Sequence, residues 1–425
     1  MSAPRRVLLI APHGSYRTGP FLRAAAELGL EVLVASRGEH SIVSSYAQGL
    51  HIDPADSETA LARILEAARE RPFHAVLGTD DSVVELASRA AAALGLPHNP
   101  AAAVRLSRRK DLARARLAER GVRVPAFARI RLDADGEDLE RAAGRVGFPL
   151  VMKPLSLSAS RGVMRADDTE ALHAGLARLR ALLACEPRLA AEERREALLE
   201  RFVPGAEVAV EAMLEGGRLR LLAVFDKPDP LDGPFFEETL YVTPSRLDAA
   251  RLAAIEAEVA AACAAFGLRE GPVHAECRLN GEGVWIIEVA ARTIGGLCAR
   301  LLRFGTGLSL EQLVLRHASG RPVALPAAAG EAGAAGVMMI PIPRAGIFKR
   351  VEGILAAQRV PGIEDIDIQI REGHELVPLP EGASYLGFIF ARAATPAEVE
   401  AALREAHARL RIVITPLWKP LAAAG

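Results

Sequence analysis

Two apolar runs that flank an asparagine–glycine pair constrain the fold of this chain most strongly. The stretch His274–Val289 is interrupted by Asn280-Gly281, a dipeptide typical of a tight turn in a β-hairpin. A hairpin fixes which residues face each other across its two strands. With the turn centred on Glu282, Glu276 lies directly opposite Glu288, and their Cβ atoms are about 5 Å apart on one face of the sheet.

These two facing carboxylates predict a magnesium site. Like charges at that distance repel each other, and the apolar neighbours at 284–287 indicate burial, which increases the cost. Either a raised pKa or a bound cation must compensate. Carboxylate oxygens together with substrate phosphates are the usual ligands of magnesium. The alternative is a pair of acids on a solvated strand face, and we favour the metal site over it.

The first hundred residues alternate between apolar runs and helical patterns. Strands are expected at 6–11, 30–35 and 74–78, and helices at 20–29, 60–69 and 81–94. Strands that alternate with helices imply a parallel sheet covered on both faces. The first turn, residues 11–19, lacks the GxGxxG pattern, so we do not expect a bound dinucleotide there.

The middle of the chain mixes helices and strands. Ser107 suits the N-cap of a helix, and Gly121 suits the residue just beyond its end. The charged stretch 169–201 predicts two helices, because Pro187 interrupts it. The other expected elements are strands at 122–130, 147–154, 208–214, 219–225, 273–279 and 284–290, and helices at 137–146 and 246–266.

The last hundred residues predict a smaller unit. An Ala/Gly/Pro-rich stretch at 322–336 indicates a linker. Strands are expected at 337–342, 366–370 and 385–391, and an amphipathic helix at 396–410. The fold class is therefore a multidomain mixture of α/β and α+β. We expect an N-terminal parallel α/β domain (1–104), a central domain (105–320) and a small C-terminal α+β domain with an antiparallel sheet (321–425).

Composition limits the partners and the compartment. The net charge is −1 and aromatic residues make up 4%, so neither nucleic acid nor a membrane surface is expected as a partner. No segment has the roughly 18 uncharged apolar residues of a membrane span, and the first apolar run, which ends at Pro12, is too short for a signal peptide. The four cysteines lack a metal-ligand spacing, which predicts reduced thiols in a cytoplasmic protein.

Two lysines and one turn are candidate phosphate contacts. Burying an unpaired ammonium is costly, so Lys153 at the end of an apolar strand needs a partner, and either a phosphate or solvent satisfies it. Lys110 lies in the first turn of its helix, where the macrodipole disfavours a cation; alone it predicts a surface lysine. The small-residue turn 156–162 offers N–H groups and hydroxyls that can cover phosphates.

Two connectors complete the candidate site. The segment 200–207 follows a predicted helix, and its free backbone groups can bind an adenine edge; a plain connector is the alternative. Arg292 lies four residues beyond Glu288 and can stabilise charge on a transferring phosphoryl group. Gly295-Gly296 allow a ligand to approach the backbone closely, whereas the alternative is a surface arginine in a flexible turn. For His274 we favour a structural role.

Taken in this order, the segments resemble the ATP-grasp superfamily. The lysine strand at 147–154 and the two-glutamate hairpin carry the resemblance in combination, and it covers roughly residues 1–320. It implies an ATP-grasp core with a mobile small lobe at 122–203, which acts as a lid that excludes water. A closer similarity, to the bacterial L-amino-acid ligases of the bacilysin-synthesis type, rests on Glu288–Gly296 and more weakly on Pro343–Gly346 and Tyr385–Phe388.

The resemblance assigns an ATP site residue by residue. Contacts with the phosphates fall to Lys110, Lys153, Ser158, Ser160 and Gly162. Contacts with adenine and ribose fall to Glu200, the Val203 backbone and Glu207. The ligands of Mg²⁺ (or Mn²⁺) are Glu276 and Glu288. Two departures from the family pattern stand out. Ala290 occupies a position where many members have asparagine, so one metal ligand is missing or replaced, and the phosphate-covering turn is richer in serine than in glycine.

The resemblance also implies a reaction in two steps. ATP phosphorylates a carboxylate to an acyl phosphate, and an amine then attacks to give an amide or peptide bond, ADP and phosphate. Lys153 and Arg292 would offset the developing charge, and the substrate contacts fall to Lys227, Arg292, Gly295 and Gly296. The expected partners are a small-molecule carboxylate, an amine and, as the assembly we consider, a second copy in a homodimer. The alternatives are an ATP-grasp carboxylase or purine-pathway ligase, and a non-catalytic nucleotide-binding regulator.

Overall fold

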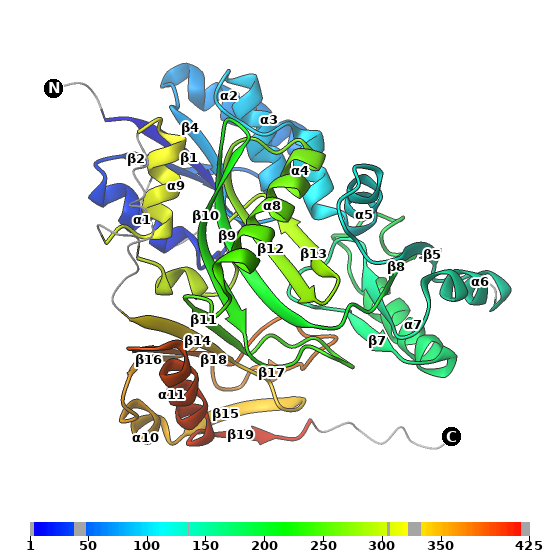
Figure 1. Cartoon of the computed structure of the whole chain (residues 1–425). Coiled ribbons are helices and arrows are strands. Elements are labelled where there is room, and N and C mark those ends of the chain that lie inside the picture. The colour runs from blue at the N-terminus through cyan, green and yellow to red at the C-terminus, as the bar shows by residue number, and fades with distance from the viewer. Residues whose placement is uncertain (1–3, 38–47, 135, 304–306, 322–332, 418–425) are drawn as a thin grey trace, which may run out of the picture.

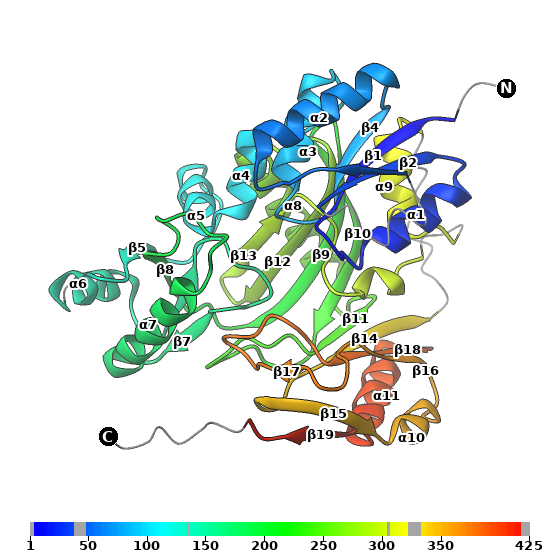
Figure 2. The ribbon, with the colours of Figure 1, turned by 180° about the vertical axis from the view of Figure 1, so that it is seen from behind.

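The described strands form four β-sheets, of which three are arranged around a long central one. The computed structural model describes residues 4–37, 48–134, 136–303, 307–321 and 333–417. The central antiparallel sheet has the N-terminal parallel sheet at one end, the C-terminal strands at the other end and a small lobe to one side (Figure 1). The view from behind gives the same arrangement (Figure 2).

The N-terminal sheet is parallel, as predicted. Its strands are β1 (Arg6–Ile10), β2 (Glu31–Ser36), β3 (Gln48–His51) and β4 (Ala75–Gly78), in the order β3-β2-β1-β4. Its helices are α1 (Thr18–Glu27), α2 (Ser57–Glu70) and α3 (Val84–Ala93). Leu8 and Ile10 pack in the cluster that contains α2 and α3, whereas Val7 and Leu9 pack with α1. Both faces of β1 are therefore buried, which explains its unbroken apolar run.

Two short helices replace the single helix expected after Ser107. These are α4 (Ala101–Arg108) and α5 (Lys110–Glu119). The prediction for Ser107 was wrong: it lies inside α4, and its hydroxyl donates to the carbonyl oxygen of Val104 at 2.8 Å. An extended Arg109 separates the helices, so that α5 begins at Lys110. Gly121 follows α5 with φ +72°, as expected of a residue beyond a helix end.

The small lobe is a four-stranded antiparallel sheet with two helices. Its elements are β5 (Phe127–Arg131), α6 (Gly136–Val146), β6 (Leu150–Pro154), β7 (Met164–Ala166), α7 (Thr169–Ala184) and β8 (Glu196–Arg201), with the strand order β5-β8-β6-β7. The predicted second helix of 169–201 is wrong, because β8 lies between β5 and β6 and pairs with both. Ala197, Leu198 and Leu199 are fully buried, so tertiary packing outweighs their helical propensity.

The central sheet contains eight strands in the order β13-β12-β9-β10-β11-β14-β18-β16. Its core strands are β9 (Ala206–Glu215), β10 (Arg218–Lys227), β11 (Leu240–Thr243), β12 (Gly271–Asn280) and β13 (Gly283–Ala290). Helix α8 (Ala249–Phe266) packs against β13 and β10, and η2 (Cys298–Leu301) and α9 (Leu310–Ala318) follow β13. The last three strands come from the C-terminal part, so the predicted central and C-terminal domains share one sheet.

The C-terminal part is an α+β arrangement, as expected. It contains β14 (Ala334–Ile340), β15 (Gly346–Glu352), α10 (Ile354–Gln358), β16 (Ile363–Ile368), β17 (Glu375–Leu376), β18 (Gly387–Ala393), α11 (Pro396–Ala408) and β19 (Arg411–Thr415). Helix α11 packs on β14 and β18, and β17-β15-β19 form a separate antiparallel sheet. The predicted linker falls mostly on 322–332, outside the described residues, and its end already belongs to β14.

Membrane-spanning helices are not found in the part of the chain that the structure describes: each of its helices is too short or too polar to cross a bilayer.

A close backbone contact at Gly205 generates a stability prediction. A Cβ atom at this position would lie 2.1 Å from the carbonyl oxygen of Leu279 on β12, and its φ of +124° is a conformation that other residues rarely adopt. We expect Gly205→Ala to cost roughly 2–4 kcal/mol of folding free energy and to lower the thermal unfolding midpoint by several degrees. Gly281→Ala is the control, since nothing lies within 4 Å of its Cβ position. Equal midpoints for the two variants would contradict this packing.

Candidate functional site

A cavity of about 520 Å³ lies where the four parts of the molecule meet. The N-terminal part contributes Asp81, the C-terminal part contributes Tyr385, and the remaining wall comes from the small lobe and the central sheet. Most of the candidate residues line it, namely Lys110, Lys153, Ser158, Ser160, Glu200, Val203, Glu207, Glu276, Glu288, Arg292, Gly295 and Gly296. Two other candidates, Gly162 and Lys227, are not among the residues that line it; Lys227 contacts three acids that do.

Glu276 and Glu288 face each other, as the hairpin predicted, but the turn differs from the expected one. Asn280 pairs with Gly283, so the turn consists of Gly281 and Glu282, and its centre lies between these two residues rather than on Glu282. A β-bulge at Ile287 then adds one residue to β13 and restores the Glu276–Glu288 pair. The carbonyl oxygen of Ile287 accepts a hydrogen bond from Arg114 of α5 at 2.6 Å, so the interrupted ladder is satisfied from outside the sheet.

Each of the two acids has an ammonium group nearby. Nζ of Lys110 lies 3.2 Å from Oε2 of Glu288, and Nζ of Lys227 lies 3.3 Å from Oε1 of Glu276. Burial would raise the pKa of Glu276, but Lys227 and His274 outweigh it and hold that pKa well below its usual value. Glu276 is therefore an ionised oxygen donor at the cavity wall, next to a second carboxylate, and this donor set fits magnesium.

The Lys227 ammonium sits among three carboxylates. It donates to Glu238 at 2.6 Å and to Glu207 at 2.8 Å, in addition to its contact with Glu276. In the described ranges these three acids are the group whose oxygens could converge on a metal ion, all within 4.8 Å of one another. Lys227 already supplies a cation at the centre of this trio, which shares Glu276 with the facing pair.

Glu238 is a cavity residue that the sequence reasoning missed. Burial raises its pKa to about 7, although the Lys227 ammonium opposes the rise. It stands two residues before β11, in the pair Glu237-Glu238, which comes shortly after a proline-rich stretch at 226–234. In the sequence, an acidic pair just before a short apolar stretch could have indicated this residue.

Lys153 has a carboxylate partner rather than open solvent. Its Nζ lies 2.6 Å from Oε2 of Glu200, and Arg114 binds the other oxygen of the same carboxylate at 2.7 Å. Burial would raise the pKa of Glu200, but Arg114 and Lys153 hold it at about 2. The sequence placed Glu200 in a connector after a helix; it lies instead in β8, opposite Val151. Arg114 was not predicted, although it shares a helix face with Lys110 four residues earlier.

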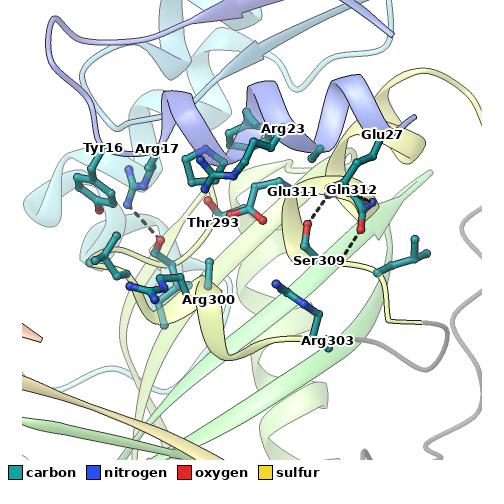
Figure 3. Close-up of a pocket in the computed structure, with 18 of the residues that line it drawn as sticks. Tyr16, Arg17, Arg23, Glu27, Thr293, Arg300, Arg303, Ser309, Glu311 and Gln312 are labelled. Atoms are coloured by element: carbon teal, nitrogen blue, oxygen red, sulfur yellow. Dashed lines mark hydrogen bonds between the residues drawn. The ribbon is translucent and has the colours of Figure 1, made fainter. Parts of the chain in front are cut away.

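Arg292 is buried and held by the N-terminal part. Its Nε donates to Oδ2 of Asp81 at 2.7 Å. Arg17 donates to the carbonyl oxygen of Ile294 at 3.2 Å, which fixes the segment that carries Gly295 and Gly296 (Figure 3). Asp81 follows β4, and ligands of open α/β sheets gather at the carboxyl ends of the strands. That position was the signal by which sequence reasoning could have found Asp81.

A second cavity of about 390 Å³ lies next to this segment, and Figure 3 shows the side chains that line it. Four arginines line it, namely Arg17, Arg23, Arg300 and Arg303. It shares Tyr16, Arg17, Ile294 and Gly296 with the larger cavity, so one short segment separates the two spaces.

The serine-rich turn has an unusual backbone. Ala159 and Ser160 have φ values of +55° and +53°, in the left-handed region. Ser158 and Ser160 line the cavity, whereas the N–H of Gly162 donates to the carbonyl oxygen of Pro380 at 2.8 Å. Lys110 supports the turn from α5, because its Nζ donates to the carbonyl oxygen of Leu157 at 2.9 Å.

The remaining candidates are held by side chains of β12. Arg278 donates to the carbonyl oxygen of Val203 and to Oε2 of Glu207, both at 2.8 Å. His274 is buried, and its Nδ1 lies 2.6 Å from Oε1 of Glu211. Although burial would lower it, the pKa of His274 is raised to about 9 by Glu211 and Glu276. His274 thus has structural contacts and also lies beside the Glu276 carboxylate.

Three protein-family models match successive parts of the chain. The ATP-grasp N-terminal domain matches residues 22–98, the ATP-grasp domain matches residues 146–300, and the L-amino acid ligase C-terminal domain 2 matches residues 338–415. The order agrees with the N-terminal sheet, the lysine and hairpin strands and the C-terminal α+β part described above.

Three individual proteins are also similar to this chain. The chain is 32% identical to carnosine synthase 1 of Gallus gallus over 335 residues, which are 75% of this chain and 36% of that protein. It is 27% identical to alanine–anticapsin ligase of Bacillus subtilis over 193 residues, which are 42% of this chain and 40% of that protein. The chain thus spans less than two thirds of each relative. The crystal structure of an L-amino acid ligase from Bacillus licheniformis matches with a TM-score of 0.84 and 26% identity, covering 98% of this chain and 100% of that one.

The fold brings two facing acids, Lys110, Lys153 and Arg292 to the wall of one cavity. The chain belongs to the ATP-grasp superfamily. Within it, the chain resembles the bacterial L-amino-acid ligases over its whole described length.

The paired acids generate a prediction for one conservative substitution. Glu288→Gln keeps the size of the side chain and removes the charge that would bind a divalent cation, so we expect ATP turnover to fall by roughly 100-fold or more with an unchanged fold. ADP release and the circular dichroism spectrum measure the two effects. Glu282→Gln is the control, because Glu282 is exposed in the turn of the same hairpin. Wild-type turnover in Glu288→Gln would contradict the metal assignment.

Proposed function

We propose that this chain is an ATP-dependent carboxylate–amine ligase that forms an amide or peptide bond through an acyl phosphate, with an amino acid as a substrate. The observation that carries the proposal is the convergence of two facing carboxylates, two lysines and one held arginine on a single cavity. Support comes also from the named ligases and synthases among its relatives and from the whole-chain likeness to an L-amino acid ligase.

In this proposal the nucleotide lies between the small lobe and the central sheet. Lys110 and Lys153 bind the phosphates, and the turn that carries Ser158 and Ser160 covers them through hydroxyl and N–H groups. The N–H of Gly162 joins them only if its bond to Pro380 opens. The carbonyl oxygen of Val203 is engaged by Arg278, so the adenine contact of this backbone falls to its N–H group.

Two further nucleotide contacts are proposed for acids that already have partners. Glu200 would act at the adenine while its carboxylate stays bound to Arg114 and Lys153. Glu207 would accept a ribose hydroxyl from its place beside Arg278 and Lys227. Both carboxylates are held by cations, which fix their orientation before the nucleotide binds.

Glu276 and Glu288 are proposed to bind Mg²⁺, which neutralises phosphate charge when it is present. Ala290 is fully buried opposite His274 and offers no ligand atom. Two cations of the chain itself, Lys153 and Arg292, offset the negative charge that develops as the phosphoryl group moves to the substrate carboxylate. Asp81 keeps the Arg292 guanidinium in place for this role.

The substrates are proposed to occupy the cavity beyond Arg292. Gly295 and Gly296 let a substrate approach the backbone closely, and aromatic side chains such as Tyr241 and Phe388 line the space next to them. The Glu238 carboxylate in this apolar wall suits an ammonium group, as an amino acid carries. Because Lys227 does not line the cavity and lies among three carboxylates, its contact with a substrate carboxylate would pass through a rearrangement of that cluster.

A panel assay tests the proposal. The protein is incubated with Mg²⁺, ATP and pairs of amino acids, ADP release is measured, and products are identified by mass spectrometry. We expect stoichiometric ADP and amide product for at least one pair. Turnover that depends on bicarbonate would instead identify a carboxylase. Binding of Mg²⁺–ATP without turnover for any pair would identify a nucleotide-binding regulator.

A further inference from the structure

A segment of the C-terminal part, residues 377–386, contacts the small lobe. The carbonyl oxygen of Pro380 accepts from the N–H of Gly162 at 2.8 Å, and that of Glu381 accepts from Nε of Arg161 at 2.7 Å. The two carboxylate oxygens of Glu381 accept from Nε and a terminal nitrogen of Arg178 in α7, the latter bond at 2.7 Å. Four hydrogen bonds thus join two residues of this segment to the small lobe.

The segment is shaped independently of the small lobe. The N–H of Gly382 donates to the carbonyl oxygen of Pro378 at 2.9 Å, and a Cβ atom at Gly382 would lie 1.8 Å from the carbonyl oxygen of Val377. Farther along, the N–H of Leu386 donates to the carbonyl oxygen of Ile340 in β14 at 2.9 Å. A closed turn at one end and a sheet contact at the other make the segment a fixed surface for the lobe to dock on.

These contacts fall next to the most strained part of the phosphate-covering turn. Ala159 and Ser160 both have left-handed backbone conformations, which L side chains adopt only when their surroundings hold them. Arg161 and Gly162, the next two residues, make the bonds to Glu381 and Pro380. These two bonds therefore hold the C-terminal end of the turn, directly after its two strained residues.

The same segment also forms part of the cavity wall. Ala383, Ser384 and Tyr385 line the cavity directly after Glu381. On the opposite side, Ser158 and Ser160 line it just before Arg161. The contact between Glu381 and the small lobe thus holds two walls of the cavity together, namely residues 383–385 and the serine-rich turn. These two walls must approach each other for a nucleotide to be enclosed.

We propose that Glu381 is a positioning residue: its carboxylate holds α7 through Arg178, its backbone carbonyl oxygen holds Arg161, and together these bonds keep the phosphate-covering turn in the conformation that binds the nucleotide. The proposal rests on the proposed function only in taking the ligand of this turn to be ATP. Because an exposed ion pair contributes little alone, loss of the Glu381 charge has a smaller effect than its reversal. Reversal places a third guanidinium beside those of Arg161 and Arg178.

The test uses the full chain and a non-hydrolysable ATP analogue with Mg²⁺. We expect Glu381→Arg to raise the dissociation constant of the analogue about fivefold and to speed hydrogen exchange of residues 156–163 in the free protein, and Glu381→Gln to have a smaller effect. The double variant Arg178→Glu with Glu381→Arg restores both values to within about twofold of wild type. The matched control is Glu375→Arg, an exposed acid in β17 of the same part.

Three outcomes would overturn the proposal: wild-type values in Glu381→Arg, an equal effect of Glu375→Arg, or no recovery in the double variant. Glu381→Gln keeps the test decisive if the charge reversal prevents folding. The measurements need no turnover, so absence of ligase activity leaves them valid. If the wild type failed to bind the analogue, the proposed function would fall, while exchange of residues 156–163 would still report on the role of Glu381.

Discussion

The repulsion between Glu276 and Glu288 is the constraint on which the rest of the site depends. Two carboxylates on neighbouring strands at a cavity wall repel each other unless cations stand close to them. Lys110 and Lys227 supply this charge in the protein alone, at 3.2 Å from Glu288 and 3.3 Å from Glu276, respectively. A bound divalent ion with its nucleotide would take over part of the same role, so the acids link the protein's own electrostatics to those of its proposed ligand.

Three parts of the fold each bring a cation to the cavity that these acids line. Helix α5 begins at Lys110, β6 of the small lobe ends beside Lys153, and the segment after β13 carries Arg292. Each cation is anchored by another element: Lys110 by the backbone of the serine-rich turn at 156–162, Lys153 by Glu200 and Arg292 by Asp81. A movement of the small lobe would therefore change the charge around the acids as well as the shape of the cavity.

The features predicted well from the sequence are those fixed by local pattern. The parallel N-terminal sheet follows from unbroken apolar runs, and the hairpin that pairs the two acids follows from Asn280-Gly281. Even there the bulge at Ile287 was invisible, because Arg114 stabilises it from a distant helix. The strand at Glu196–Arg201 was read as a helix, since Leu-Leu-Glu-Arg has helical propensity and its pairing with β5 and β6 is a tertiary effect.

The partners of the site residues were the least predictable part. Lys153 meets Glu200, and Gly162 meets Pro380, through contacts between segments far apart in the sequence. Composition and spacing carry no information about such pairs. The most direct test of the central claim is Mn²⁺ binding in the presence of ADP, followed by electron paramagnetic resonance. We predict tight binding by the wild type and loss of that binding in Glu276→Gln. Unchanged Mn²⁺ affinity in that variant would contradict the assignment of these acids as the metal ligands.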